Sequence, residues 1–176
     1  MQSLVIRFLC VIAAVATSLT AVNAQAGTAT ANMAVQIVIT ASCTINAASL
    51  NFGSNAGTAL VSTDILANTT VSVTCTNGSP YAIGMDNGAN ASGSQRRMKS
   101  GSNFLNYNLY LDIGNSVPWT TATAGPPPAC TTINNCSLGT GTGSPQSVSI
   151  YGKVPSIGTA PPTGTYTDTV TMTIAY

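Results

Sequence analysis

The sequence predicts an all-β protein, an antiparallel sandwich of six or seven short strands joined by polar turns. After the first 24 residues there is no convincing helical period, whereas a two-residue alternation of apolar and polar side chains recurs along the chain. Thr, Ser, Asn, Gly and Ala are abundant, and β-branched residues are spread throughout. Turn-rich stretches at 87–93, 124–144 and 155–164 separate the alternating runs. This arrangement favours an antiparallel sandwich over βαβ units.

The first 24 residues have the organisation of a secretory signal peptide. Arg7 supplies a positive charge, residues 8–19 are apolar, and residues 22–24 place small side chains before a cleavage site at Gln25. The apolar run is too short to span a bilayer comfortably. We therefore expect an exported protein whose mature chain of about 150 residues forms one domain with one core.

The alternating runs locate the expected strands in order along the mature chain. They are residues 29–39, 69–75, 81–85, 104–111, 146–154 and 169–176. We expect Asp86-Asn87-Gly88 to close the third run as a turn, because the loop lacks the Glu and the register of a calcium-binding EF-hand. The Pro- and Gly-rich stretch 124–144 makes a central strand there implausible.

The mature chain carries almost no charge, which bears on several function classes. It has no His and no Glu, and its four Asp balance four Lys and Arg, so its net charge lies near zero and the usual electrostatic route to nucleic acid is missing. General acid–base catalysis needs His or tuned carboxylates, and the carboxylates are scattered. We expect neither an enzyme nor a cofactor, and we expect Asp168 at a turn or strand edge. The charged residues are Asp64, Asp86, Asp112, Asp168, Arg96, Arg97, Lys99 and Lys153.

Four cysteines remain after the leader, an even number that indicates two disulfides in an exported protein. Three pairings are open. We favour Cys43–Cys75, because both lie in strand-like runs, and Cys130–Cys136, because they flank a short loop. The longer bridge should stabilise the domain by on the order of 3–4 kcal/mol. A zinc site is disfavoured, since there is no His and no CxxC spacing.

Two further features are better explained by structure than by a binding site. Arg96, Arg97 and Lys99 form the only basic cluster, which we expect to be a solvated loop rather than an anion site. Trp119 follows a proline, and we expect core or edge packing rather than an exposed adhesive finger.

The run 29–39 is the most hydrophobic of the alternating segments, and it begins a few residues after the predicted cleavage site. Such a strand can close its own sheet. Alternatively, it can leave its domain and complete an open groove in another subunit, where backbone ladder bonds provide affinity and alternate side chains fill pockets. The residues alone leave both interpretations open.

Several motifs, in their order and spacing, resemble the spore coat protein U domain, which builds subunits of archaic chaperone–usher (Csu-type) pili. The resemblance covers nearly the whole mature chain, and a G-x-Y-x-D-x-V segment that begins at Gly164 is its strongest part. The other matching stretches are Leu50–Gly53, Val71–Cys75, Arg97-Met98, Leu105–Tyr110, Trp119 and Tyr151–Val154.

The resemblance implies an incomplete immunoglobulin-like antiparallel β-sandwich that is completed by a donor strand from another subunit. It implies a signal peptide at 1–24, an N-terminal donor-strand extension at 25–40 and a pilin domain at 41–176. Cys43–Cys75 matches the usual bridge of the family, whereas the second pair departs from its simplest members. The donor residues would be Ala31, Met33, Val35, Ile37 and Ile39, and the acceptor-groove and chaperone-facing strand would carry Val170, Met172, Ile174 and Tyr176.

We therefore expect a structural subunit of a surface pilus that supports adhesion and biofilm formation. The expected partners are further copies of the chain, a periplasmic chaperone, an outer-membrane usher and other pilus subunits, with no nucleic acid and no metal. A stalk-forming role is favoured because one domain with an extension can both donate and accept a strand. The alternatives are a spore or cell-surface coat protein with the same fold, and a minor or tip adhesin.

Overall fold

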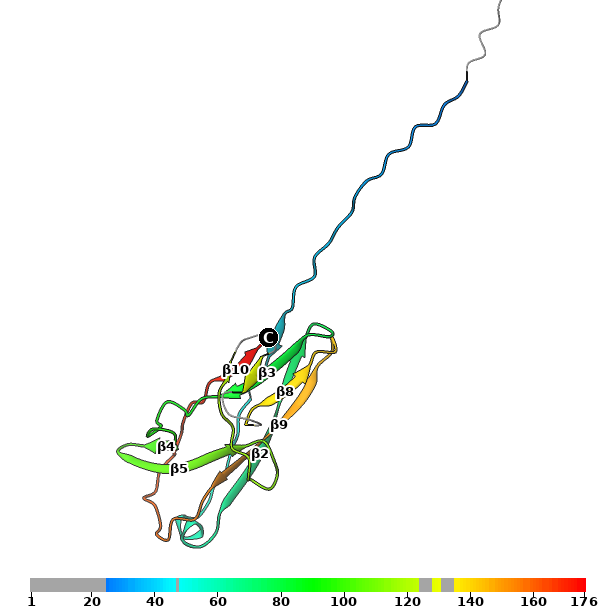
Figure 1. The fold of residues 1–176 in the computed structure, drawn as a ribbon. Helices are drawn as coiled ribbons and strands as arrows, with labels where there is room; N and C mark the ends of the chain where they lie inside the picture. Colours follow the sequence, from blue (N-terminus) through cyan, green and yellow to red (C-terminus); the bar gives the residue numbers. More distant parts are fainter. Residues whose placement is uncertain (1–24, 47, 124–127, 131–134) are drawn as a thin grey trace, which may run out of the picture. The chain divides into compact units, whose positions relative to one another are not determined.

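A computed structural model describes residues 25–46, 48–123, 128–130 and 135–176 (Figure 1). The predicted signal peptide lies outside the described residues. The chain divides into two units, residues 1–38 and 39–176, and each is described by itself. In the first unit, residues 25–38 form no helix or strand, and every one of them is exposed.

The second unit is built on a five-stranded antiparallel sheet with the strand order β1-β2-β9-β5-β4. Its longest pairing joins β2 to β9, from Ile65 opposite Val154 to Val73 opposite Gln146. The five strands are β1 (Cys43–Ile45), β2 (Ile65–Cys75), β4 (Arg96–Ser100), β5 (Asn103–Tyr110) and β9 (Gln146–Val154).

A three-stranded antiparallel sheet with the order β10-β3-β8 (Figure 1) packs across the core from the first sheet. Strands β6 and β7 form a separate pair. A short 3-10 helix, η1 (Gly57–Val61), precedes β2. The remaining strands are β3 (Pro80–Met85), β6 (Ala122–Thr123), β7 (Ala129–Cys130), β8 (Ser137–Thr140) and β10 (Met172–Ala175).

The core lies between the two larger sheets because each strand turns alternate side chains inward. On β2, Val71 and Val73 are fully buried, and on β3 the same holds for Ile83 and Met85. Trp119 is only 1% exposed, and its indole N–H donates to the carbonyl of Tyr110 over 2.9 Å. The tryptophan is therefore a core residue, as the sequence favoured.

The structure confirms an all-β, antiparallel protein, with several corrections to individual elements. Residues 29–39 form no strand, and the last strand is shorter than expected, covering 172–175 instead of 169–176. Residues 96–100 form strand β4, where we expected a solvated loop. Within the turn-rich stretch 124–144, β8 forms at the edge of its sheet rather than in the centre.

Candidate functional site: an open groove between two chain segments

The second unit contains an open groove of about 900 Å³ between two segments that are not strands. One wall is the segment 48–55, which precedes η1, and the other is the segment 161–170, which leads into β10. The floor is apolar and belongs to the core of the protein. It consists of Leu60, Ile65, Met85, Met98, Leu105, Tyr107, Leu109, Ile150 and Val154.

The C-terminal wall is hydrogen-bonded along one edge only. The amide and carbonyl of Thr167 bond with Lys99 over 3.1 and 2.8 Å, and the carbonyls of Thr169 and Thr171 accept from Ala89 and Asp86 over 2.9 and 3.0 Å. Successive residues of an extended chain direct their backbone groups to opposite edges. The residues that alternate with these three are Tyr166, Asp168 and Val170. Their backbone groups form no hydrogen bond with another backbone group among the described residues. The wall therefore presents one unpaired edge.

The N-terminal wall also lacks a backbone ladder. Among the described residues, the backbone of 48–53 forms no bond with another backbone group, and its polar contacts are local turns made by Asn51 and Asn55. Leu50 and Phe52 anchor the wall by packing against the core. The ring of Phe52 contacts that of Tyr107 edge to face, with 6.4 Å between the ring centroids. Gly152 beneath them has no side chain, and a Cβ there would collide with both.

Two carboxylates hold the C-terminal wall in addition to the backbone bonds. Asp168 accepts from the Tyr107 hydroxyl over 2.7 Å, and its other oxygen accepts from the backbone and side-chain amides of Asn90 over 3.0 Å each. Asp86 accepts from the amide of Thr171 over 2.9 Å. The wall is thus tied by side chains to β5 and to the loop that follows β3.

The pKa values of this cluster follow from burial and hydrogen bonding. Burial by itself would raise the pKa of Asp86, but the bonds from the amides of Thr171 and Gly88, together with the Arg96 charge, outweigh it and place the pKa below its ordinary value. Burial, reinforced by the hydrogen bond to Asp168, raises the pKa of Tyr107 well above its ordinary value. Both effects preserve the hydrogen-bonded states, with Asp86 ionised and Tyr107 protonated.

Arg96 is a structural residue that the sequence interpretation placed wrongly on a solvated loop. It is 2% exposed, and its guanidinium donates to the backbone carbonyls of Met85, Asp86 and Trp119 at 2.6 to 3.2 Å. The strand β4 points this cation inward and leaves Arg97 and Lys99 on the other face, against the ring of Phe104. A pattern of apolar residues could not detect an inward-facing arginine.

The structure distributes the predicted groove residues unevenly. Val170 and Met172 line the groove, Ile174 is half-buried against the core, and Tyr176 is 50% exposed and does not line it. Sequence reasoning missed the opposite wall, although the alternation of Leu50 and Phe52 was a usable signal. It also missed Tyr166 and Asp168 as parts of the C-terminal wall.

The proposed donor residues are exposed where the structure describes them. The exposed fractions are 84% for Met33 and Val35, 81% for Ile37 and 72% for Ile39, and Ala31 is exposed too. Ile39 begins the second unit, whereas the other four donor residues belong to the first. The segment therefore exposes four large apolar side chains at alternate positions.

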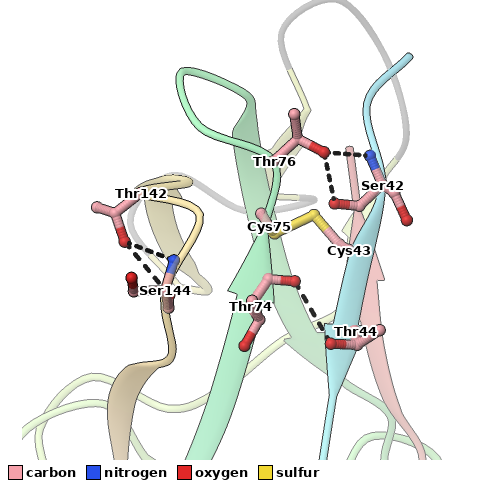
Figure 2. The surroundings of a disulfide bond; sticks show 8 residues. All are labelled: Ser42, Cys43, Thr44, Thr74, Cys75, Thr76, Thr142 and Ser144. Atoms are coloured by element: carbon pink, nitrogen blue, oxygen red, sulfur yellow. Dashed lines mark hydrogen bonds between the residues drawn. A yellow bond between two sulfur atoms is a disulfide. The ribbon is translucent and has the colours of Figure 1, made fainter. Parts of the chain in front are cut away.

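Both disulfides favoured by the sequence are formed. Cys43–Cys75 joins β1 to β2 at directly opposed positions, and Figure 2 shows it next to the paired bonds between Thr76 and Ser42. Cys130–Cys136 joins the end of β7 to the residue before β8. Among the described residues no group of three or more His, Cys, Asp or Glu could hold a metal, and no helix is long and apolar enough to cross a membrane.

Comparisons with known proteins find relatives in sequence and in fold. The chain is 34% identical over 168 residues to Protein U of Myxococcus xanthus. The alignment covers 87% of this chain and 88% of that protein. Its fold is similar to a chain in the crystal structure of the CsuC–CsuE chaperone–tip adhesion subunit pre-assembly complex from archaic chaperone–usher Csu pili of Acinetobacter baumannii. That match has a TM-score of 0.52 and 25% identity, and it covers 78% of this chain but 40% of the other.

The profile of one protein family matches residues 29–173, which include the proposed donor residues, both disulfides and both walls of the groove. With this match and the similarity to Protein U, the chain belongs to the Spore Coat Protein U domain family.

Proposed function

We propose that this protein is a structural subunit of a surface pilus that assembles by donor-strand exchange, in which the N-terminal extension of one copy occupies the groove of another. The observation that carries the proposal is the groove with an apolar floor and two walls whose backbone edges are unpaired. An added extended strand would form main-chain bonds with both walls and place alternate side chains on the floor.

The extension has the chemistry that this groove requires. Its odd-numbered positions from 31 to 39 are apolar, and they alternate with Asn32, Ala34, Gln36 and Val38. Burying each large aliphatic side chain contributes about 1.5–3 kcal/mol, and each ladder bond adds about 1 kcal/mol. Four such side chains and a ladder would make a long-lived joint between subunits.

An uncovered groove is a hazard during export, because an apolar floor with open edges promotes aggregation. A periplasmic chaperone that lends a temporary strand would prevent this, and an outer-membrane usher would then exchange it for the next subunit. The likeness to a chain of a chaperone–pilus subunit complex supports this route. Val170 and Met172 would be the wall residues that the chaperone strand meets, with Ile174 and Tyr176 beyond the groove.

A spore or cell-surface coat is the second candidate, favoured by the similarity to Protein U and by the family itself. Such a coat would use the same strand exchange without forming a fibre. Electron microscopy of the cell surface separates the two, because a pilus subunit gives thin filaments and a coat protein gives a continuous layer.

The decisive experiment changes one face of the extension at a time. In Val35→Asp/Ile37→Asp, two charges would enter the apolar floor, so the heat-sensitive ladder of multimers in an SDS gel of surface-sheared material should disappear. The matched control Gln36→Asp/Val38→Asp places the same charges on the opposite face and should keep the ladder. A ladder of wild-type intensity in the first variant would refute the proposal.

A further inference from the structure

The C-terminal wall of the groove differs from the other wall in how it is held. The segment 48–53 packs on the core through Leu50 and Phe52, and among the described residues its backbone bonds to no other backbone group. The segment 165–171 is fixed by backbone bonds and by two carboxylates that come from different parts of the chain, Asp86 from the loop after β3 and Asp168 from the wall itself. The two walls are therefore held by different kinds of contacts, one by apolar packing and the other by hydrogen bonds.

The carboxylate bonds form where the regular pairing of β10 with β3 gives way to single backbone bonds, from the amide of Asp86 to the carbonyl of Thr171 and from the amide of Ala89 to that of Thr169. Strand β10 pairs with β3 only as far as Met172 opposite Met85. Beyond that point β3 has ended, and the amide of Thr171 bonds to the Asp86 carboxylate instead of to a strand carbonyl. Three residues further from β10, Asp168 reaches inward to the Tyr107 hydroxyl, which lies at the groove floor. The bond from Tyr107 ties the wall to the floor, and the bond from Thr171 ties the end of the wall to the loop after β3.

Tight local packing supports the same arrangement. Gly88 has a positive φ of 84°, and a Cβ at this position would collide with the carboxylate of Asp168. A side chain at Gly164, where the wall begins, would collide with Ser100. These contacts explain the spacing of the G-x-Y-x-D-x-V segment. Gly164 lets the chain pass close to Ser100, Tyr166 packs on the core, and Asp168 bonds the wall to Tyr107.

We infer that Asp86 and Asp168 are positioning residues for strand acceptance, which hold the segment 165–171 in place so that its free edge is ready for a donor strand. This inference rests on the proposed function. The donor strand would pair first with the C-terminal wall, which is already held in position. The N-terminal wall would then adjust to the bound strand.

The test uses a full mature chain that accepts but cannot donate, namely the Val35→Asp/Ile37→Asp variant. It is refolded with a labelled synthetic peptide of residues 28–41, and the dissociation rate is measured by chase with unlabelled peptide. Adding Asp168→Ala or Asp86→Ala should speed dissociation roughly tenfold, because charge-assisted bonds to the wall are lost. The control Asp112→Ala removes a carboxylate that bonds to the amides of Ser116 and Val117 outside the groove, and should change the rate less than about twofold.

A second measurement separates positioning from general stability. Hydrogen exchange followed by NMR should show faster exchange at the amides of Thr167 and Thr171 in the Asp168→Ala and Asp86→Ala chains, with β2 and β9 unchanged. Tyr107→Phe removes only the hydroxyl that bonds to Asp168. It should therefore weaken retention less than Asp168→Ala, and add nothing when the two are combined.

The outcomes distinguish the inference from the function beneath it. If the acceptor chain fails to retain the peptide at all, the proposed function falls and the inference falls with it. If the peptide is retained and both alanine variants release it at the rate of the Asp112→Ala control, only the positioning role is overturned. Faster exchange throughout β2 and β9 in both variants would likewise overturn it, because the carboxylates would then serve general stability.

Discussion

At the scale of single residues, the least expected feature is a cation buried in a protein that has very few charges. The Arg96 guanidinium replaces water with backbone carbonyls from β3, from the residue after it and from Trp119. Burial lowers the pKa of Arg96, while the nearby Tyr107, Asp86 and Asp168 act in the opposite direction. The arginine thus links β4 to the opposite sheet through hydrogen bonds rather than through apolar contact.

Replacing Arg96 tests this role. Arg96→Met keeps a long side chain but leaves the carbonyls of Met85 and Asp86 without these donors, and it should lower the free energy of unfolding by about 3 kcal/mol. Lys99→Met on the exposed face of the same strand is the control, with an expected change within about 0.5 kcal/mol. Urea unfolding followed by fluorescence measures both, and equal midpoints would contradict the structural role of Arg96.

The acid response follows from the carboxylates. The pKa of Asp86 is lowered in the folded protein, so its ionised form contributes stability that is present above about pH 4 and is lost as the pH falls through the folded pKa. The pKa values of Asp64 and Asp112 are also lowered, by the Lys153 bond and the Val117 amide respectively. The thermal midpoint should therefore stay flat between about pH 7 and pH 5 and drop below about pH 4.

The control for this response is Asp86→Asn, which removes the titrating group and should reduce the acid loss. Circular dichroism melts across the pH range measure it. A midpoint that rises on acidification, or an identical loss in the variant, would show that the ionised carboxylate of Asp86 does not stabilise the folded state.

At the scale of elements, alternation located β5 and β9, which bury one regular face, and also β3, which is buried on both faces. The span of β9 was predicted to the residue, and those of β3 and β5 to within one residue at each end. Alternation failed where tertiary bonds override it. In β4 the inward residue is a cation that hydrogen bonds make tolerable. In the segment 169–171 the alternation is real, but the wall lacks a strand partner on its open edge, so it forms no regular strand.

The candidate site could be predicted only in part for the same reason. The apolar positions Val170 and Met172 were visible as a period-two pattern, and the structure places both in the groove. The contribution of Leu50 and Phe52 depends on Gly152 in a distant strand, and the contribution of Asp168 depends on Tyr107 and Asn90. Contacts between residues this far apart in the chain cannot be read from local patterns.

The two disulfides should stabilise the fold to different extents. Loop-closure entropy predicts about 4 kcal/mol for Cys43–Cys75, with a sequence separation of 32, and about 2 kcal/mol for Cys130–Cys136, with a separation of 6. Cys43→Ser/Cys75→Ser should thus lower the thermal midpoint more than Cys130→Ser/Cys136→Ser. Calorimetry of both double variants measures the difference, and the reverse order would contradict the loop argument.

At the scale of the whole molecule, the scarcity of charge determines what conditions the proposed assembly can withstand. The formal net charge is +1, and Lys153–Asp64 is the one ion pair found among the described residues. Joints made of apolar burial and backbone bonds should be insensitive to ionic strength. Multimers should therefore persist from about 0.01 to about 1 M NaCl and dissociate only on heating in SDS. Dissociation by salt alone would indicate an electrostatic interface instead.

The placement of the first disulfide has a mechanical consequence. Cys43 opens the first strand of the domain, and its bridge reaches Cys75 at the end of β2, which pairs along nine residues with β9. A force that pulls on the chain ahead of Ser42 would otherwise peel β1 from β2 one hydrogen bond at a time. The covalent link transfers the tension directly to β2, the longest strand of the sheet. The hydrogen bonds between β2 and β9 then share the load, so the domain resists unfolding better than bonds that break one at a time.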